Sequence, residues 1–394
     1  MDKPAESQPA HQGPLAGVRV LEFSGIGPGP FCGMLLADMG AEITLLEREG
    51  GTFASQLFGG GRKTVANRGK KSVCINLKHP DSKGLVHRLI REVDVLIEGY
   101  RPGVMERLGF GPDECLALNP RLIYGRMTGW GQSGPLSQRA GHDANYAAIS
   151  GVLDTGRRGK GAPWAPPTLV GDMGGGGLVL AWGIACALFE AKHSGKGQIV
   201  DAAMFEGAAL LAHGLFNLQA IGAWDGACAL DSSAPFYDVY QCADGLWLSV
   251  CPLEPQFYSS FIERLGLAGD PDFAGKQYDT SLWPGMKQRL TEIFQSKSRA
   301  YWAGLFDDTD DCVWPVLTLC EAPQHPHSRA RQSFVDIGGI VQPAPAPKFS
   351  RTPGQIRNPP PLLGEHSVEQ LLALGLSFAE VEQFTASGVL VTAN

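Results

Sequence analysis

Two short segments carry side chains that could exchange protons with a substrate. Gly141-His142-Asp143 follows a turn, and Gly171-Asp172 precedes Met173 and four glycines that open a helix. Histidine and aspartate serve as general acids and bases, and a carboxylate near a helix start is favoured by the N–H groups and dipole there. Each residue also has a structural interpretation, Asp172 as an N-cap and His142 as a satisfied interior histidine.

The most basic segment of this acidic chain is residues 62–71, Arg-Lys-Thr-Val-Ala-Asn-Arg-Gly-Lys-Lys, and Lys78, Arg101 and Arg107 follow it. Fixed cations in a glycine-containing loop suit a polyphosphate, because charge-assisted contacts to phosphate are strong. Coenzyme A is one such anion. An ordinary solvated loop is an equally good interpretation of the composition.

A glycine-rich turn, Gly25-Ile26-Gly27-Pro28-Gly29, lies between a predicted strand and a predicted helix, and Glu47 ends the next strand. This pattern resembles a dinucleotide-binding fingerprint and would suit a nicotinamide dehydrogenase. The spacing differs, however, and Pro28 and Pro30 stand inside the turn. A tight turn that packs the helix close to the sheet fits better, and such a turn could still line a ligand pocket.

The elements that must position these residues alternate in the first half of the chain. Predicted strands and helices follow one another at 18–23, 31–39, 42–46, 85–92, 93–98, 122–127 and 198–201. This order predicts an α/β fold with a parallel sheet. After Trp224 the pattern changes: a hairpin around Asp244-Gly245 and short helices at 255–265, 284–295 and 300–306 predict a smaller α+β domain. We therefore predict a large domain over 1–223, a small domain over 224–328, and over 329–394 a proline-rich linker followed by a C-terminal segment that returns to the large domain.

Composition excludes several classes of protein. The formal net charge of -7 gives no general attraction to nucleic acid or an anionic membrane. Nine scattered cysteines without a Cys-x-x-Cys pair indicate a reduced compartment and no zinc site. The first 13 residues lack the apolar core of a signal peptide, and the apolar stretch 177–190 is short for a membrane span. We expect a cytoplasmic protein without a metal.

Longer motifs resemble the class III, formyl-CoA transferase type, superfamily of CoA-transferases over about Leu15 to Leu376. The residues that carry the resemblance are Leu-Ala-Gly-Val-Arg-Val-Leu-Glu-Phe at 15–23, Pro-Gly-Pro-Phe-Cys at 28–32, Leu-Leu-Ala-Asp-Met-Gly-Ala at 35–41, the segment 94–109, Gly-Trp-Gly-Gln-Ser-Gly-Pro at 129–135 and Gly-Lys-Gly-Gln-Ile-Val-Asp at 195–201. The resemblance implies a large Rossmann-like domain, a smaller α+β domain, and two chains interlocked as a homodimer.

Two segments are similar to a racemase branch of that family. Ala-Gly-His-Asp-Ala-Asn-Tyr at 140–146 supplies His142, and Leu-Glu-Pro-Gln-Phe-Tyr at 253–258 supplies Glu254 as the partner of that histidine. The resemblance implies interconversion of R and S 2-methylacyl-CoA thioesters through an enolate, with His142 and Asp172 as the acid–base pair. Asp143 would stabilise the enolate oxygen through its backbone N–H. In the alternative, a CoA-transferase, Asp172 is the nucleophile that forms an acyl anhydride.

The resemblance also implies the residues that contact CoA, which is bound as part of the substrate, with no further cofactor required. They are Arg48, Ile75, Asn76, Leu77, Lys78, Gly99, Tyr100, Arg101, Arg107, Gly141, Asn145 and Tyr146. The chain departs from the family pattern at Ser232 and Ser233, where glycines are usual. That departure concerns the preference for the acyl chain more than the chemistry.

Overall fold

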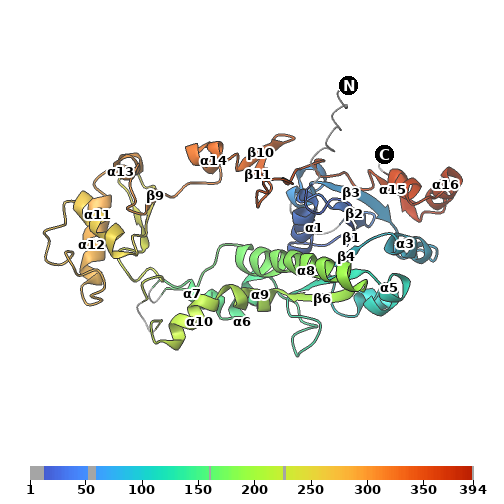
Figure 1. The fold of residues 1–394 in the computed structure, drawn as a ribbon, viewed down its shortest axis with the longest axis horizontal. Coiled ribbons are helices and arrows are strands. Elements are labelled where there is room, and N and C mark those ends of the chain that lie inside the picture. The colour runs from blue at the N-terminus through green and yellow to red at the C-terminus, as the bar shows by residue number, and fades with distance from the viewer. Residues whose placement is uncertain (1–12, 52–58, 159–160, 225–227, 393–394) are drawn as a thin grey trace, which may run out of the picture. The chain divides into compact units, whose positions relative to one another are not determined.

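The computed structural model describes residues 13–51, 59–158, 161–224 and 228–392, so residues 1–12 of the polar N-terminal segment considered above lie outside it. The chain divides into two compact units (Figure 1). Unit 1 holds the described residues up to Ser150, Pro166–Leu211 and those from Pro326 onward, and unit 2 holds 151–165 and 212–325. Segments 151–165 and 212–223, assigned to the large domain from the sequence, therefore cluster with unit 2, and residues 326–328 cluster with unit 1.

A seven-stranded sheet forms the centre of unit 1, in the order β12-β3-β2-β1-β4-β5-β6. Its strands are β1 Arg19–Phe23, β2 Glu42–Glu47, β3 Lys70–Ile75, β4 Val95–Glu98, β5 Ile123–Thr128, β6 Gln198–Ala203 and β12 Leu390–Val391. All pairs are parallel except β12 with β3. The predicted α/β fold with a mostly parallel sheet is confirmed. The order reverses between β1 and β4, and open α/β sheets bind ligands at the carboxyl ends of strands beside such a point.

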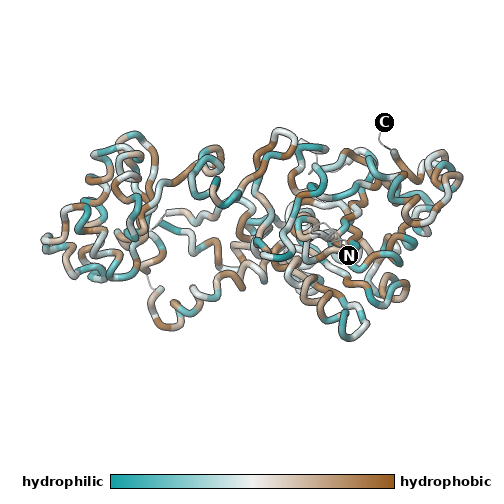
Figure 2. Tube along the Cα trace, turned by 45° about the horizontal axis from the view of Figure 1, so that its top comes forward, coloured by the Kyte–Doolittle hydropathy of each residue, from teal (hydrophilic) through white to brown (hydrophobic). Residues whose placement is uncertain are grey.

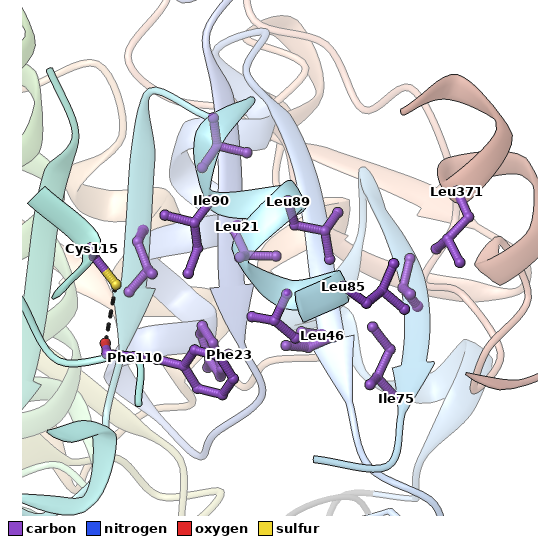
Figure 3. Close-up of a cluster of buried hydrophobic side chains, with 14 of the residues drawn as sticks. Leu21, Phe23, Leu46, Ile75, Leu85, Leu89, Ile90, Phe110, Cys115 and Leu371 are labelled. Atoms are coloured by element: carbon purple, nitrogen blue, oxygen red, sulfur yellow. Dashed lines mark hydrogen bonds between the residues drawn. The ribbon is translucent and has the colours of Figure 1, made fainter. Parts of the chain in front are cut away.

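Alternating side chains along the strands build two hydrophobic layers. Leu21 and Phe23 of β1 face the first layer (Figure 3), while Val20 faces the second. The helices α3 Ser82–Arg91, α4 Val104–Leu108, α5 Pro112–Leu118, α15 Ser367–Ala373 and α16 Phe378–Ala386 contribute to the first layer. The second layer is covered by α1 Pro28–Asp38, α6 Asp143–Ile149, α8 Val179–Ser194 and α9 Met204–Leu211. A sheet apolar on both faces explains its continuous Val, Ile and Leu runs.

The helix α8 continues a π-helix, η3, over Leu169–Leu178. Together they span Leu169–Ser194, which by length and composition alone is apolar enough to cross a membrane. The apolar stretch 177–190 identified in the sequence is thus only part of a longer apolar helix. Gly175, Gly176 and Gly177 are buried in η3 because α9 and α1 approach its backbone closely, and a Cβ on Gly175 would lie 2.5 Å from the nitrogen of Ala208.

The basic segment 62–71 is not a continuous loop. Short 3-10 turns, η1 Gly61–Lys63 and η2 Val65–Asn67, lead into β3, which the sequence analysis missed. Arg68 is buried with Asp38, Nη2 to Oδ2 2.5 Å, and Lys70 is fully buried with Glu22, Nζ to Oε1 2.8 Å. Both interpretations from the sequence, a phosphate site and a solvated loop, are therefore wrong for Arg68 and Lys70. Their side chains are buried in unit 1 and form ion pairs with carboxylates of the same unit.

Unit 2 has its own hydrophobic core, and hydrophobic segments occur in both units (Figure 2). Its antiparallel sheet, order β7-β8-β9, includes the predicted hairpin. Its elements are α7 Val152–Thr155, α10 His213–Ala220, β7 Asp238–Gln241, β8 Trp247–Val250, α11 Pro255–Arg264, α12 Trp283–Phe294, α13 Arg299–Phe306, β9 Val313–Pro315 and the 3-10 turn η4 Ala322–Gln324. The predicted hairpin and the three predicted helices are confirmed.

The C-terminal part of unit 1 starts with α14 Pro326–Ala330 and the hairpin of β10 Phe334–Ile337 with β11 Ile340–Pro343. An irregular proline-rich connection follows, as the sequence predicts. The chain then returns to the sheet, where Leu390 of β12 pairs with Ile75 of β3 and Leu371 of α15 joins the first layer (Figure 3).

Candidate active site

A cavity of about 340 Å³ lies in unit 1 at the carboxyl ends of β1, β4 and β5. The segments that follow these strands line it, together with residues from α6 and η3. Its lining includes Gly25, Ile26, Gly99, Tyr100, Arg101, Trp130, Gly141, His142, Tyr146, Asp172 and Met204. The cavity thus occupies the position next to the reversal of strand order, and it joins both predicted acid–base residues.

Asp172 is the fourth residue of η3 and is half-buried at this cavity. The alternative interpretation as an N-cap is wrong, because Thr168 occupies the N-cap position. Burial and the neighbouring carboxylate of Asp143 raise the pKa of Asp172 to about 6, while His142 opposes that rise. A carboxyl group that titrates this close to neutrality can give and take a proton under ordinary conditions.

His142 is the N-cap residue of α6 and is exposed, so the interpretation as an interior histidine is wrong. Its backbone N–H donates to Oδ1 of Asn145 at 3.0 Å, which fixes the start of the helix. The hydroxyl of buried Tyr146 donates to the carbonyl of Gly141. Burial raises the pKa of Tyr146 to about 12, which keeps this donor protonated. The turn that presents His142 is therefore held from both sides.

Asp143 contributes its side chain to the site as well as its backbone. Its side chain is buried, and its two carboxylate oxygens accept N–H groups from the first turn of η3. As the first residue of α6, Asp143 also has a backbone N–H without an intrahelical acceptor. The role predicted for this N–H, stabilisation of an enolate oxygen, stays a prediction, whereas the carboxylate contacts had no counterpart in the sequence pattern.

The glycine-rich turn lies against Asp172. Gly27 has φ of 68° and precedes α1, and a Cβ on it would lie 3.2 Å from Oδ2 of Asp172. Pro28 and Pro30 occupy the first turn of α1, where a missing N–H is tolerated. The turn therefore lines the cavity and permits close approach of the helix, as the non-nucleotide interpretation predicts.

The predicted CoA contacts fall into two groups. Gly99, Tyr100, Arg101, Gly141 and Tyr146 line the cavity. Tyr100 is held by its own N–H, which donates to Glu98 at 2.8 Å, and by its hydroxyl, which donates to the carbonyl of Ser24 at 3.2 Å. The buried guanidinium of Arg126 holds Glu98 in turn, Nε to Oε1 2.8 Å. Sequence reasoning missed Arg126 and Glu98, because nothing in a short strand marks an ion pair between neighbours.

The second group lies at the same edge of the sheet without lining the cavity. Arg48 follows β2 and is exposed, and Asn76, Leu77 and Lys78 follow β3. Ile75 is fully buried in the core, which leaves only its backbone for a ligand. The remaining predicted contacts are exposed, Arg107 on α4 and Asn145 on α6.

Glu254 belongs to unit 2, where it is the exposed N-cap residue of α11. Ser232 of the same unit adopts φ of 66°, a conformation that suits the glycine usual in the family. Within the residues described, no three His, Cys, Asp or Glu side chains are grouped so as to hold a metal ion.

Comparisons with known proteins agree with these observations. A family model described as CoA-transferase family III matches residues 15–367. Alpha-methylacyl-CoA racemase of Mus musculus is 44% identical over 382 residues, which cover 95% of this chain and 97% of that protein. The Homo sapiens protein of the same name is 42% identical with the same coverage. A crystal structure of a CAIB/BAIF family protein from Brucella suis superimposes with a TM-score of 0.81 at 25% identity, covering 92% of this chain and 100% of that chain.

Proposed function

This chain belongs to CoA-transferase family III, and we propose from that premise that it is a racemase of 2-methylacyl-CoA thioesters. The family predicted from the motifs is confirmed. Relatives named alpha-methylacyl-CoA racemase, at 44% and 42% identity over nearly the whole chain, support racemisation. The observation that carries the proposal is that His142 and Asp172 line one cavity, with the pKa of Asp172 raised to about 6.

Inversion at the alpha carbon requires two proton carriers. A base on one face of the carbon removes the proton, the electrons move onto the thioester oxygen as an enolate, and an acid on the other face returns a proton. His142 serves one enantiomer and Asp172 the other. Positioned acid–base groups of this kind contribute about 10² to 10⁴ in rate. The raised pKa of Asp172 suits it to both roles, because the protonated and ionised forms are each populated near pH 6.

The enolate oxygen needs hydrogen-bond donors that are already in place. The N-terminus of α6 provides a free N–H at Asp143 and the positive end of a helix dipole. One such donor is worth on the order of 3 kcal/mol in the transition state. From the resemblance, we assign Glu254 the role of holding the imidazole ring of His142 in one tautomer.

Coenzyme A binds, in this proposal, along the carboxyl edge of the sheet in unit 1. Arg48, Lys78, Arg101 and Arg107 are exposed cations that follow or flank β2, β3 and β4. Guanidinium groups bind phosphate through paired hydrogen bonds. The remaining predicted contacts, from Ile75 to Leu77 and from Gly141 to Tyr146, would border the nucleotide and the pantetheine arm. No further cofactor is required by this chemistry.

A second copy of the chain completes the proposed assembly. Large apolar side chains are exposed on η3, α8 and α9, among them Leu169, Leu178, Trp182, Leu210 and Leu211, with exposed fractions of 50% to 63%. Large apolar side chains that are exposed in such numbers favour an interface. We propose that an interlocked homodimer covers it, in a cytoplasmic protein whose nine cysteines are all unpaired.

Deuterium wash-in at the alpha carbon tests the function. Wild-type protein in D₂O should exchange the alpha proton of a 2-methylacyl-CoA enantiomer and form the other enantiomer. His142→Ala should lower inversion at least about 100-fold, while the control His193→Ala, an exposed histidine on α8, should not. Inversion that survives in His142→Ala contradicts the assignment. Transfer of CoA to an added free acid, with hydroxylamine trapping at Asp172, would favour the transferase alternative.

A further inference from the structure

The carboxylate of Asp143 makes contacts of its own, separate from the backbone N–H to which a role was assigned above. Resting on the proposed racemase function, we propose that this carboxylate is a positioning group. It clamps the first turn of η3, which carries Asp172, and it holds a fixed negative charge beside the Asp172 carboxyl group. Asp143 would thereby set both the place of Asp172 and the pH range in which it carries a proton.

The clamp consists of three hydrogen bonds from one turn of backbone. Oδ1 of Asp143 accepts the N–H groups of Gly171 at 2.8 Å and Asp172 at 2.9 Å, and Oδ2 accepts that of Thr168 at 3.2 Å. The first N–H groups of any helix lack intrahelical acceptors. Thr168, a residue type that often caps helices, makes no capping bond with its own side chain here. A carboxylate from another helix, α6, supplies the cap instead.

Two local features of the chain accommodate this carboxylate. Thr168 has φ of 61°, which is a strained conformation for a β-branched residue and persists only where neighbours hold it. Its N–H is directed to Oδ2 of Asp143 in that conformation. Gly171 has no side chain in the way: a Cβ there would lie 2.8 Å from both the carbonyl oxygen and Oδ1 of Asp143.

The charges around Asp172 come chiefly from α6. The carboxylate of Asp143 raises the pKa of Asp172 and the imidazole of His142 lowers it. The carboxylate of Asp172 in turn helps to raise the pKa of Tyr146, which is also on α6 and donates its hydroxyl hydrogen to Gly141. The turn of α1 that faces Asp172 brings no titratable side chain, and its residues Pro28 and Pro30 lack the N–H donors that would favour an anion. Besides burial, the causes of the shift are these two residues of α6, Asp143 and His142.

A carboxylate that positions Asp172 and sets its titration can be distinguished from one that only stabilises the start of η3. A carboxylate that only capped η3 would affect stability and leave the titration of Asp172 where it is. A carboxylate that also sets the charge must shift that titration when its own charge is removed. The distinction is measurable because Asp143→Asn keeps one oxygen acceptor for the N–H groups of Gly171 and Asp172, while it removes the charge and replaces the second oxygen with a donor.

The experiment follows the Asp172 carboxyl by ¹³C NMR in the full-length protein labelled with [4-¹³C]aspartate, with Asp172→Asn to assign the signal. In Asp143→Asn the titration midpoint of Asp172 should fall by about 1 pH unit. The kcat for alpha-proton exchange at pH 7 should fall about tenfold, with KM changed less than about twofold. Asp113→Asn, which removes an exposed aspartate from α5 in the same unit, is the matched control and should shift neither quantity.

The outcomes are separable. A midpoint that stays within about 0.3 unit of wild type, in a variant that remains folded by circular dichroism, overturns the role of Asp143. An unchanged kcat overturns it as well. If Asp143→Asn does not fold, Thr168→Gly is added, because glycine adopts the positive φ at this position without steric cost. The same titration of Asp172 is then measured in the double variant. Wild-type protein that exchanges no alpha proton refutes the proposed racemase, whereas the NMR titration requires no activity and judges Asp143 by itself.

Discussion

Two groups of charges lie near the N-terminal half of α1, and they differ in how they are neutralised. Beneath the helix, Lys70 donates to Glu22 at 2.8 Å, to the carbonyl of Pro30 at 2.9 Å and to Asn67 at 3.3 Å. At the turn before the helix, Asp172 faces the cavity beside a second carboxylate, Asp143. The first group pairs a cation with an anion, whereas the second places two anions together.

The difference shows which buried charges belong to the fold and which to the chemistry. Burial raises the pKa of Glu22, and the opposing effect of Lys70 is what makes its ionisation possible. Such a pair is retained as part of the sheet's interior, and breaking it is costly. The first turn of η3, which carries Asp172, contains no basic side chain to pair with this carboxyl group. Its pKa stays raised at the cavity, and a raised pKa of this kind is typical of a functional group. Variants in each of the two groups can test this contrast.

The largest effect on stability is expected for Lys70→Met, which leaves Glu22 ionisable, buried and unpaired. We expect the free energy of unfolding to fall by about 3–5 kcal/mol, measured by urea denaturation at fixed protein concentration. Lys71→Met is the matched control, because Lys71 is the next residue of β3 and forms an exposed ion pair with Glu369. That change should cost less than about 1 kcal/mol.

The double variant Lys70→Met, Glu22→Leu sharpens the same prediction. Apolar residues of similar volume can replace a buried ion pair with little loss, so the second change should recover most of the stability. A loss below about 1 kcal/mol for Lys70→Met alone would contradict the view that this pair belongs to the fold.

A smaller effect of opposite sign is expected in the second group, at Asp172. Burial and the neighbouring Asp143 raise the pKa of Asp172 from its ordinary value of 3.8 to about 6 in the folded protein. The folded state therefore binds the proton more tightly, and wild-type stability falls as pH rises from about 4 to about 6. Asp172→Asn should raise the free energy of unfolding by about 1–2 kcal/mol at pH 7.5, a figure reduced for the partial exposure of the group.

The gain should vanish as the pH falls to about 4, where the wild-type carboxyl is protonated in both states. Urea denaturation of both proteins at pH 4.5 and pH 7.5 measures it, and racemase activity should be lost at both values. A variant that is less stable than wild type at pH 7.5 would place Asp172 with the structural charges after all.

The sequence predicts most of the sheet because hydrophobic runs and turn residues are local features. The strands at β1, β2, β4 and β5, and the glycine turn before α1, follow directly from such patterns. β3 was missed because Lys70 and Lys71 begin it, and a lysine that is neutralised by a residue 48 positions away looks like a solvated one. The partner, Glu22, is visible only once β1 and β3 are placed in one sheet.

The candidate site shows the same limit. His142 and Asp172 could be named from the family motifs, but their own dipeptides left both structural interpretations open. The carboxylate of Asp143 escaped notice because its partners are backbone N–H groups 25 to 29 residues away, and backbone groups leave no trace in a sequence. The positive φ of Thr168 was equally hidden, since threonine is not a residue from which a left-handed conformation is inferred.

The smallest expected effect on the free energy of unfolding concerns Thr168. There the unfavourable contribution comes from a left-handed backbone conformation and not from a charge. A left-handed conformation costs a non-glycine residue roughly 1–2 kcal/mol, while a new glycine increases the entropy of the unfolded chain by about 0.4–1 kcal/mol. Thr168→Gly should therefore raise the free energy of unfolding by about 0.5 kcal/mol. Thr168→Ala keeps the unfavourable φ and serves as the control, for which we expect no gain. If both variants lose stability equally, the threonine side chain matters more than its backbone, and the conformation of Thr168 is not held against a cost by Asp143.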